Sequence, residues 1–313
     1  MLYDLDTIKK KLLSISGISP LTYNDEHLLR ASFPNDETQY MYSFLYLLRA
    51  SHNDDGSLGY KFIDNDITAV IGYRNTMLYI TPIYDATQGQ KLQLLCRELF
   101  SKANCRILIK KFSQKKYPKL NIKETVTKRE FEDDACPETL IELKKLFINQ
   151  EGELNIKASK LLKMIRRFER SRIQYEILHD FSSISLPKIE EFLKKDNKKY
   201  TNYYPILSYL YATKTNAFRT IIYIYDWTVA GLYIADQLSP TKVGLYCAVN
   251  AKEIKGSTEW MDYYFFKYLF SDGIQQVYLG GSENEGVNYY IKKLLPSNTS
   301  YTVTAAEYDP TDS

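Results

Sequence analysis

The clearest pattern of apolar and polar positions lies between residues 244 and 296. An apolar run of strand length, 245–249, is followed by a polar loop at 255–258. Apolar residues then recur every three or four positions, at Met261, Tyr264, Phe265, Tyr268 and Leu269. Residues at this spacing share one face of an α-helix, so the pattern predicts an amphipathic helix after the loop.

The same alternation repeats before the chain reaches Pro296. Residues 276–279 have the length and composition of a strand, and Gly280, Gly281 and Ser282 break it. Helical spacing then returns at Val287, Tyr290, Ile291, Leu294 and Leu295. Proline ends the helix because it lacks a backbone N–H. We therefore expect strand, loop, helix, strand, loop and helix, with polar loops at the strand ends.

One order of elements occurs in both halves of the chain. In the first half, strand-like segments at 59–63, 67–73 and 77–83 precede a helical stripe (Leu92, Leu95, Cys96, Leu99) and a strand at 106–109. In the second half, segments at 218–225, 229–235 and 243–249 precede the helix that begins near Thr258. The repetition predicts a mixed α/β fold of two similar halves, 1–135 and 136–313.

Composition and charge limit the classes of protein to which the chain can belong. Its 313 residues, 44% of them hydrophobic, are enough to bury two cores of ordinary size. The net charge is only +3, from 41 basic and 38 acidic residues, so the overall charge does not indicate a nucleic-acid-binding protein and any such role must depend on local patches. The four cysteines form no CxxC pair and the chain starts without an apolar signal segment, so we expect a cytoplasmic protein with reduced thiols.

The most apolar stretch, 217–235, raises the question of a membrane span. Arg219 and Asp226 interrupt it, and Gly231 lies inside it. Two strands joined at Asp226 and Trp227 explain the pattern better, so we expect no transmembrane segment.

The loop of Lys255, Gly256, Ser257 and Thr258 is a candidate seat for the phosphate of a donor molecule. It follows a predicted strand and opens a predicted helix, where unpaired backbone N–H groups attract a phosphate or a carboxylate. The same residues also have the composition of an ordinary helix cap, and the pattern leaves both interpretations open.

A second candidate is a row of basic residues, which we call the basic stripe. Its members, Lys160, Lys163, Arg167 and Arg170, follow one another at helical spacing, opposite the apolar positions Leu161, Ile165 and Phe168. A solvated helix face is the simplest interpretation. The functional interpretation is a polyanion site that meets the phosphates of a tRNA acceptor stem or of a pantetheine nucleotide.

In the order and spacing of its elements, the closing segment resembles the second half of a GNAT-type acyltransferase domain. The usual acyl-CoA signature of that superfamily, a Gln or Arg followed by spaced glycines, is absent, because 251–256 contains only Gly256. With its Lys-x-x-x-Pro ending at 292–296, the chain is more similar to the DUF2156 and Fem-type group, relatives of the phosphatidylglycerol lysyltransferase catalytic region. The resemblance implies tandem GNAT-like halves packed as one compact unit, with the donor site in the second half.

Candidate catalytic residues follow the last predicted core strand. Glu283 lies in the loop there, and Tyr289 lies off the apolar stripe of the next helix, where its phenol can donate a proton to a leaving group. The resemblance implies that role for Tyr289, because a tyrosine on this helix serves as general acid in GNAT enzymes. Glu283 has the alternative of capping the helix.

Together these features predict an enzyme, an acyl- or aminoacyl-transferase acting on an amine or hydroxyl acceptor. Aminoacyl-tRNA is the expected donor; an acyl-CoA-dependent N-acyltransferase and a catalytically silent binding module are the alternatives. We expect a small molecule or a peptide as acceptor, and no covalently bound cofactor. No metal is expected, because His27, His52 and His179 lie far apart in the sequence and without metal-ligand spacing.

Overall fold

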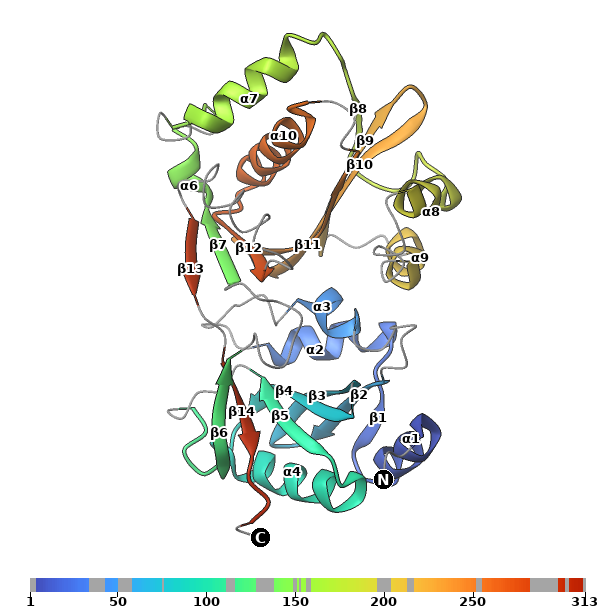
Figure 1. Ribbon diagram of the computed structural model, residues 1–313, viewed down its shortest axis with the longest axis vertical. Coiled ribbons are helices and arrows are strands. Elements are labelled where there is room, and N and C mark those ends of the chain that lie inside the picture. The colour runs from blue at the N-terminus through green and yellow to red at the C-terminus, as the bar shows by residue number, and fades with distance from the viewer. Residues whose placement is uncertain are drawn as a thin grey trace. The chain divides into compact units, whose positions relative to one another are not determined.

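The computed structural model describes residues 4–33, 43–49, 58–74, 76–110, 116–127, 138–148, 151, 153–155, 159–195, 204–212, 217–251, 255–281, 298–301 and 304–311. The chain divides into two compact units (Figure 1). Unit 1 consists of Met1–Asp133 and Thr302–Ser313, and unit 2 consists of Asp134–Tyr301. Each unit is built on one seven-stranded mixed sheet.

The sheet of unit 1 has the strand order β1-β2-β3-β4-β5-β14-β6. Its strands are β1 (Ile18–Pro20), β2 (Leu58–Asp64), β3 (Ile67–Arg74), β4 (Met77–Asp85), β5 (Arg106–Lys110), β6 (Ile122–Thr127) and β14 (Thr304–Tyr308). Its helices are α1 (Leu5–Leu13), the 3-10 helix η1 (Tyr23–Asp25), α2 (Glu26–Ser32), α3 (Phe44–Arg49) and α4 (Gln90–Ala103). Strands β2, β3 and β4 form an antiparallel meander, and α4 then carries the chain to β5, which is parallel to β4.

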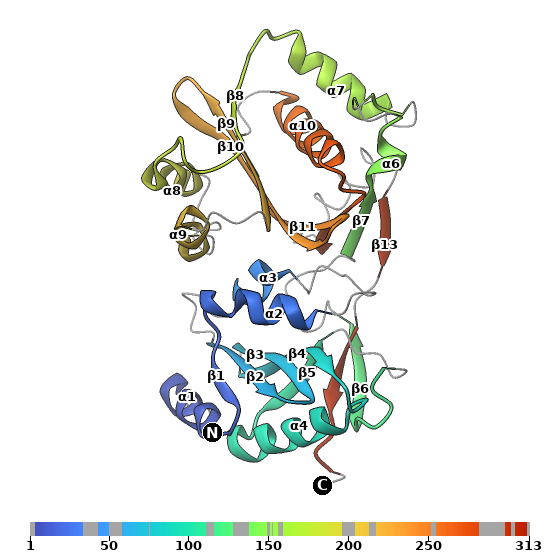
Figure 2. The same ribbon diagram turned by 180° about the vertical axis from the view of Figure 1, so that it is seen from behind.

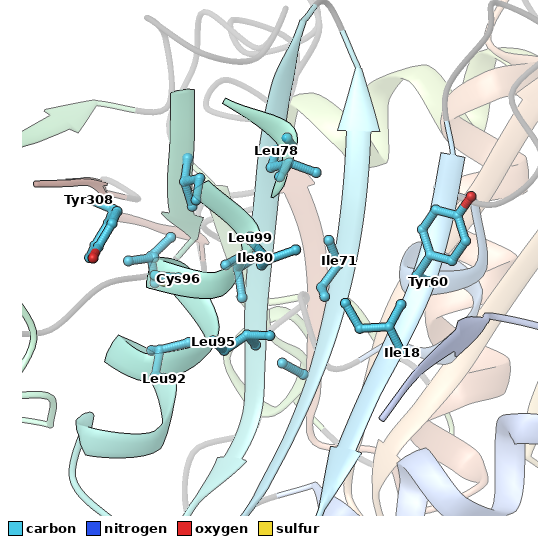
Figure 3. Close-up of a cluster of buried hydrophobic side chains, with 14 of the residues drawn as sticks. Ile18, Tyr60, Ile71, Leu78, Ile80, Leu92, Leu95, Cys96, Leu99 and Tyr308 are labelled. Carbon is cyan, nitrogen blue, oxygen red and sulfur yellow. The ribbon is translucent and has the colours of Figure 1, made fainter. Parts of the chain in front are cut away.

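The core of unit 1 lies between α4 and the sheet. The apolar stripe of α4 is buried, as its helical spacing predicts; it consists of Leu92, Leu95, Cys96 and Leu99. These side chains pack with Ile71 of β3 and Ile80 of β4 (Figure 3). The helix is bounded by two residues in the left-handed conformation, Gly89 before it and Asn104 after it.

The sheet of unit 2 has the strand order β13-β7-β12-β11-β10-β9-β8. Its strands are β7 (Glu138–Glu142), β8 (Glu176–Leu178), β9 (Phe218–Tyr225), β10 (Thr228–Ser239), β11 (Lys242–Asn250), β12 (Gln276–Gly281) and β13 (Asn298–Tyr301). Its helices are α6 (Leu143–Leu146), α7 (Ser159–Glu169), α8 (Leu186–Lys195), α9 (Tyr204–Ala212) and α10 (Ser257–Ser271). The meander of β9, β10 and β11 leads through α10 to β12, which is parallel to β11.

Helices cover both faces of the meander in unit 2. Helices α7 and α10 lie on one side of it and α8 and α9 on the other, in both views of the molecule (Figures 1 and 2). Met261, Phe265 and Leu269 of α10 are buried against the sheet, where they share a core with Ile221 and Tyr233. The amphipathic helix expected after the polar loop is therefore present.

The two sheets share one topology. In each, a meander of three antiparallel strands is joined through a helix to a parallel strand, and two further antiparallel strands lie beyond that strand in the sheet. This confirms the mixed α/β fold with two similar halves. The strands beside β5 and β12 are exchanged between the halves: β14, from the end of the chain, lies beside β5, and β7, which follows the strands of unit 1 in the chain, lies beside β12. Strand β6 of unit 1 is followed in the chain by β7 of unit 2, and β13 of unit 2 is followed by β14 of unit 1.

The exchange makes the division of the structure differ from the expected halves, 1–135 and 136–313. The first boundary lies close to the expected one, at 133–134. The end of the chain belongs to unit 1 because β14 pairs with β5 on one side and β6 on the other. The helix expected at 287–295 lies outside the described residues.

Candidate functional site

Strands β11 and β12 part after a short region of pairing. Their parallel register runs from Lys242 opposite Gln276 to Gly244 opposite Tyr278. Strand β12 then continues beside β7, whereas β11 extends six residues further without pairing to β12. The edge of an extended strand carries hydrogen-bonding groups that suit an extended ligand. The parted strands therefore mark one end of the candidate site.

Helix α10 begins close to this end of β11. Its N-cap residue is Gly256, which has a left-handed φ of 89° that residues with a Cβ adopt rarely. A Cβ built on Gly256 would lie 2.8 Å from the carbonyl oxygen of Met164 and 3.4 Å from Cβ of Phe168, both on α7. Gly256 therefore allows α7 to pack directly on the start of α10, a role that the sequence pattern did not reveal.

The other residues of the predicted donor seat lie in different surroundings. Ser257 is fully buried, and its side chain is hydrogen-bonded to Tyr175. Burial raises the pKa of Tyr175, and that hydrogen bond opposes the rise. Lys255 is exposed and Thr258 is half-buried. The seat itself stays a prediction, with Lys255 at its solvent side.

Aromatic rings join α7, α10 and the sheet. Phe168 of α7 stacks on Tyr175, with centroids 5.4 Å apart and planes 5° apart. Trp260 of α10 lies 5.3 Å from Phe168 and 5.6 Å from Tyr175. Tyr223 of β9 meets Tyr175 edge-on at 5.9 Å. Such contacts fix the position of α7 on α10 beyond what apolar burial alone provides.

A chain of three polar side chains lies where β11 ends. The Tyr233 hydroxyl donates to Asp262 Oδ1 at 2.5 Å, and Asn250 Nδ2 donates to the Tyr233 oxygen at 2.8 Å. Because the carboxylate can only accept, this order fixes the orientation of the Asn250 amide. Its Oδ1 is buried and has no hydrogen-bond partner among the described residues. A buried acceptor of this kind is a place where a ligand N–H would be stabilised.

Gly231 of β10 makes room for this chain, because a Cβ there would lie 2.7 Å from Met261 Sδ and 3.2 Å from Asn250 Oδ1. The glycine inside an apolar strand was the only sequence signal for this polar chain.

The basic stripe lies on the outer face of α7 and on the residue that follows this helix. Lys160, Lys163, Arg167 and Arg170 are all exposed, whereas Leu161, Ile165 and Phe168 are buried. None of the four forms an ion pair with another residue that the structure describes. The packing of α7 on α10 thus brings the stripe and the predicted donor seat into one region of unit 2.

The predicted catalytic residues, Glu283 and Tyr289, lie outside the described residues. Within the described ranges, no three His, Cys, Asp or Glu side chains gather as metal ligands would. Nor does any helix in those ranges combine the length and apolarity that crossing a bilayer requires.

Neither the family models nor the curated proteins give a match to this sequence. Solved structures match its fold. A conserved protein of unknown function from Bacteroides thetaiotaomicron has a TM-score of 0.70 and 15% identity, and the match covers 93% of this chain and 99% of that one.

Two further structures share the fold. One is the C-terminal DUF2156 domain of an Agrobacterium fabrum protein assigned as a lysylphosphatidylglycerol synthetase, with a TM-score of 0.60, 10% identity and coverage of 91% and 92%. The other is FemX, with a TM-score of 0.58, 9% identity and coverage of 94% and 98%. This chain therefore has the fold of the GNAT-like DUF2156 and Fem-type group, as its sequence pattern predicted.

Proposed function

We propose that this chain transfers an acyl or aminoacyl group to an amine or hydroxyl acceptor, and that aminoacyl-tRNA is its donor. The observation that carries the proposal is the packing of α7 on the start of α10. Through Gly256 the two helices approach closely, and in this proposal the basic stripe of α7 and the donor seat at the start of α10 bind one donor together. A donor with both a reactive ester and a phosphate backbone fits such a surface.

The charge on α7 suits a polyanion. From Lys160 to Arg170 the stripe spans ten residues, which is about 15 Å along a helix. All four cations face solvent, where phosphates can replace their counterions. Binding should therefore weaken steeply as salt is added.

The end of β11 and the start of α10 would hold the reactive part of the donor. The extended part of the donor would lie along the edge of β11. The dipole of α10 and the Lys255 ammonium would attract a phosphate of the donor. Asn250 Oδ1 would accept an N–H of the aminoacyl group or of the acceptor.

The reaction needs two proton transfers. The acceptor nitrogen or oxygen attacks the ester carbonyl, the bond from that carbon to the ribose oxygen breaks, and the attacking atom loses a proton while the ribose oxygen gains one. We assign the donation of a proton to the ribose oxygen to Tyr289, the role that the resemblance implies, and in this proposal Glu283 removes the proton from the acceptor.

The similar structures support the reaction class. The C-terminal domain of the protein assigned as a lysylphosphatidylglycerol synthetase has the same fold over 92% of the domain's chain, which supports an aminoacyl donor here.

One observation favours the second candidate, an acyl-CoA-dependent N-acyltransferase. An exposed lysine directly before a helix start suits a pyrophosphate as well as a tRNA phosphate. The two donors differ in the number of phosphates they present, so that binding can separate them.

The experiment compares the donors on the intact protein. We expect charged tRNA to bind, to raise the melting temperature and to lose its aminoacyl group to an amine, whereas CoA should leave the melting temperature unchanged. Reversing Lys163 and Arg167 to Glu should weaken tRNA binding more than tenfold and lower the salt dependence of log K. The matched control reverses Lys9 and Lys102, two exposed lysines of unit 1.

Stabilisation by CoA without any binding of tRNA would overturn the tRNA proposal and favour acyl-CoA. Equal effects of the two double reversals would return the stripe to an ordinary solvated helix face.

A further inference from the structure

The tip of the hairpin between β9 and β10 carries an exposed tryptophan. Trp227 is 83% exposed, more than any other large hydrophobic residue in the described part of the chain. An indole in water stabilises no core, so burial within the chain does not explain this residue.

The backbone of this tip also argues against a purely structural role for Trp227. The turn has two central residues, Asp226 with φ 49° and Trp227 with φ 63°, between the paired residues Tyr225 and Thr228. Two-residue turns with both φ values positive favour Asn-Gly or Asp-Gly, because a Cβ is unfavourable in the left-handed region. Glycine at 227 would suit this turn better, so the fold alone does not favour tryptophan here.

The tip lies at the same end of unit 2 as the end of α7. Strand β8 pairs with β9 from Glu176 opposite Ile224, so the residues just before β8 lie beside the tip. Tyr175 contacts Tyr225 at 6.1 Å and stacks on Phe168 of α7. Figures 1 and 2 show the hairpin tip and the end of α7 at one end of this unit.

Exposed cations lie in the last turn of α7 and directly after it. Arg166, Arg167, Arg170 and Arg172 are all exposed, and Arg170 and Arg172 follow α7 directly. An exposed aromatic ring beside a line of cations is the combination that binds single-stranded nucleic acid, since the ring stacks on a base while the cations meet phosphates.

An anionic bilayer is the other surface that attracts tryptophan and arginine, and the turn disfavours it. Asp226 and Trp227 form the same two-residue turn, so a bilayer that buried the indole would also desolvate the Asp226 carboxylate, which is costly. A nucleobase covers one face of the indole and leaves the carboxylate in water.

We propose that Trp227 stacks on an unpaired nucleobase of an RNA whose phosphates lie on the basic stripe and on Arg172. This inference rests on the proposed function, because it extends the tRNA surface of α7 to the hairpin tip. It adds a stacking contact that is independent of charge.

The decisive variant is Trp227→Gly, because it removes the ring and improves the turn. We expect it to keep or raise the melting temperature and to bind tRNA about 5- to 150-fold more weakly. The salt dependence of log K should stay that of the wild type, since no phosphate contact is lost. Reversing Lys163 and Arg167 should change that salt dependence, which separates stacking from charge.

Fluorescence gives a direct reading of the contact. The chain has two tryptophans, Trp227 and Trp260, and Trp260 is half-buried among the rings between α7 and α10. A short oligoadenylate should quench the emission of the wild type, and this quenching should disappear in Trp227→Gly.

Unchanged tRNA and oligoadenylate affinity in Trp227→Gly would overturn the inference, as would a wild type that binds neither RNA. Binding to phosphatidylglycerol vesicles that depends on Trp227, without such a dependence for RNA, would overturn it in favour of a lipid surface. If the wild type binds oligoadenylate through Trp227 but transfers nothing from charged tRNA, the inference stands and the proposed function fails.

Discussion

The loops that open α4 in unit 1 and α10 in unit 2 are equivalent in topology and different in chemistry. Each follows the third strand of a meander, and each has a left-handed glycine as N-cap, Gly89 with φ 99° and Gly256 with φ 89°. In unit 1 the Asp85 carboxylate accepts the N–H groups of Thr87 and Gly89, at 2.8 and 3.0 Å. The donors before α4 are thus occupied by a residue of their own loop.

In unit 2 no described side chain caps α10 in that way, and the Ser257 side chain is hydrogen-bonded to Tyr175. Among the described residues, an external anion would have to displace a carboxylate at the start of α4 but not at the start of α10. The comparison teaches that two helix starts with the same place in a shared fold can differ in the groups that occupy their N–H donors. It supports the placement of the donor seat in the second half.

The largest expected effect comes from replacing the two cap glycines. Gly256→Val places a branched side chain against the Met164 carbonyl at 2.8 Å, whereas the nearest neighbours of a Cβ on Gly89 lie at 3.3 and 3.4 Å. Both changes strain a left-handed residue, and Gly256→Val should cost about 1–3 kcal/mol more because it also overpacks the contact with α7. Urea unfolding of the two variants measures the difference. Equal losses of unfolding free energy in the two variants would mean that α7 moves away from the new side chain without a measurable cost.

Removing Asp85 is the next largest change. Asp85→Ala deletes the acceptor of two backbone N–H groups and of the Thr87 hydroxyl, which should destabilise unit 1 by about 1–2 kcal/mol. Donor affinity should stay unchanged, and equilibrium binding of tRNA checks this. A weaker donor affinity would place part of the site in unit 1 and end the contrast between the loops.

Tyr233→Phe tests the polar chain of unit 2. Losing the hydroxyl leaves Asp262 and Asn250 without the bonds they make to it, at a cost of about 1–2 kcal/mol. The control is Tyr223→Phe, which removes a buried bond of 2.8 Å to the Met261 carbonyl. We expect similar losses of stability but a larger fall in transfer rate for Tyr233→Phe. If the transfer rate fell equally in Tyr233→Phe and Tyr223→Phe, the polar chain would have a purely structural role.

The smallest expected effect concerns the alkylation rates of buried cysteines. Because the described part of each unit contains one such cysteine, these rates report separately on the opening of unit 1 and of unit 2. Burial raises the pKa of Cys96 in unit 1 and of Cys247 in unit 2, so both should resist alkylation until their unit opens. Burial raises the pKa of Cys105 to about 11, so its thiolate fraction is small at neutral pH. Its alkylation should rise about tenfold per pH unit from pH 8 to pH 10. Mass spectrometry locates the modified residues.

In the Gly256→Val variant, Cys247 should react faster while Cys96 keeps its wild-type rate. Equal acceleration at both thiols would show that the two units open together.

What the sequence could predict were features encoded over short distances. The stripe of α10 follows from helical spacing, and the hairpin turn at Asp226 and Trp227 follows from the interruption of a long apolar stretch by Asp226. The contact of Gly256 with Met164 joins residues far apart in the chain, and no local pattern reports it. The chain from Asn250 through Tyr233 to Asp262 likewise depends on three separate elements, which come together only after packing.

The exchange of β7 and β14 could not be predicted for the same reason. Strand pairing depends on which edges remain unpaired, and neither strand is among the segments that the sequence pattern predicts. A division of the chain by position alone therefore assigns its last strand to the wrong sheet.

The exchanged strand also sets the order in which the protein can be completed during synthesis. Strand β14 lies between β5 and β6, and about 180 residues separate the end of β6 from the end of β14. At the usual pace of a ribosome those residues take about 10–40 s to make. For that time the sheet of unit 1 lacks its connecting strand and exposes two edges. We therefore expect a newly made first half to attract chaperones, and its sheet is complete only when β14 has been made and has paired with β5 and β6.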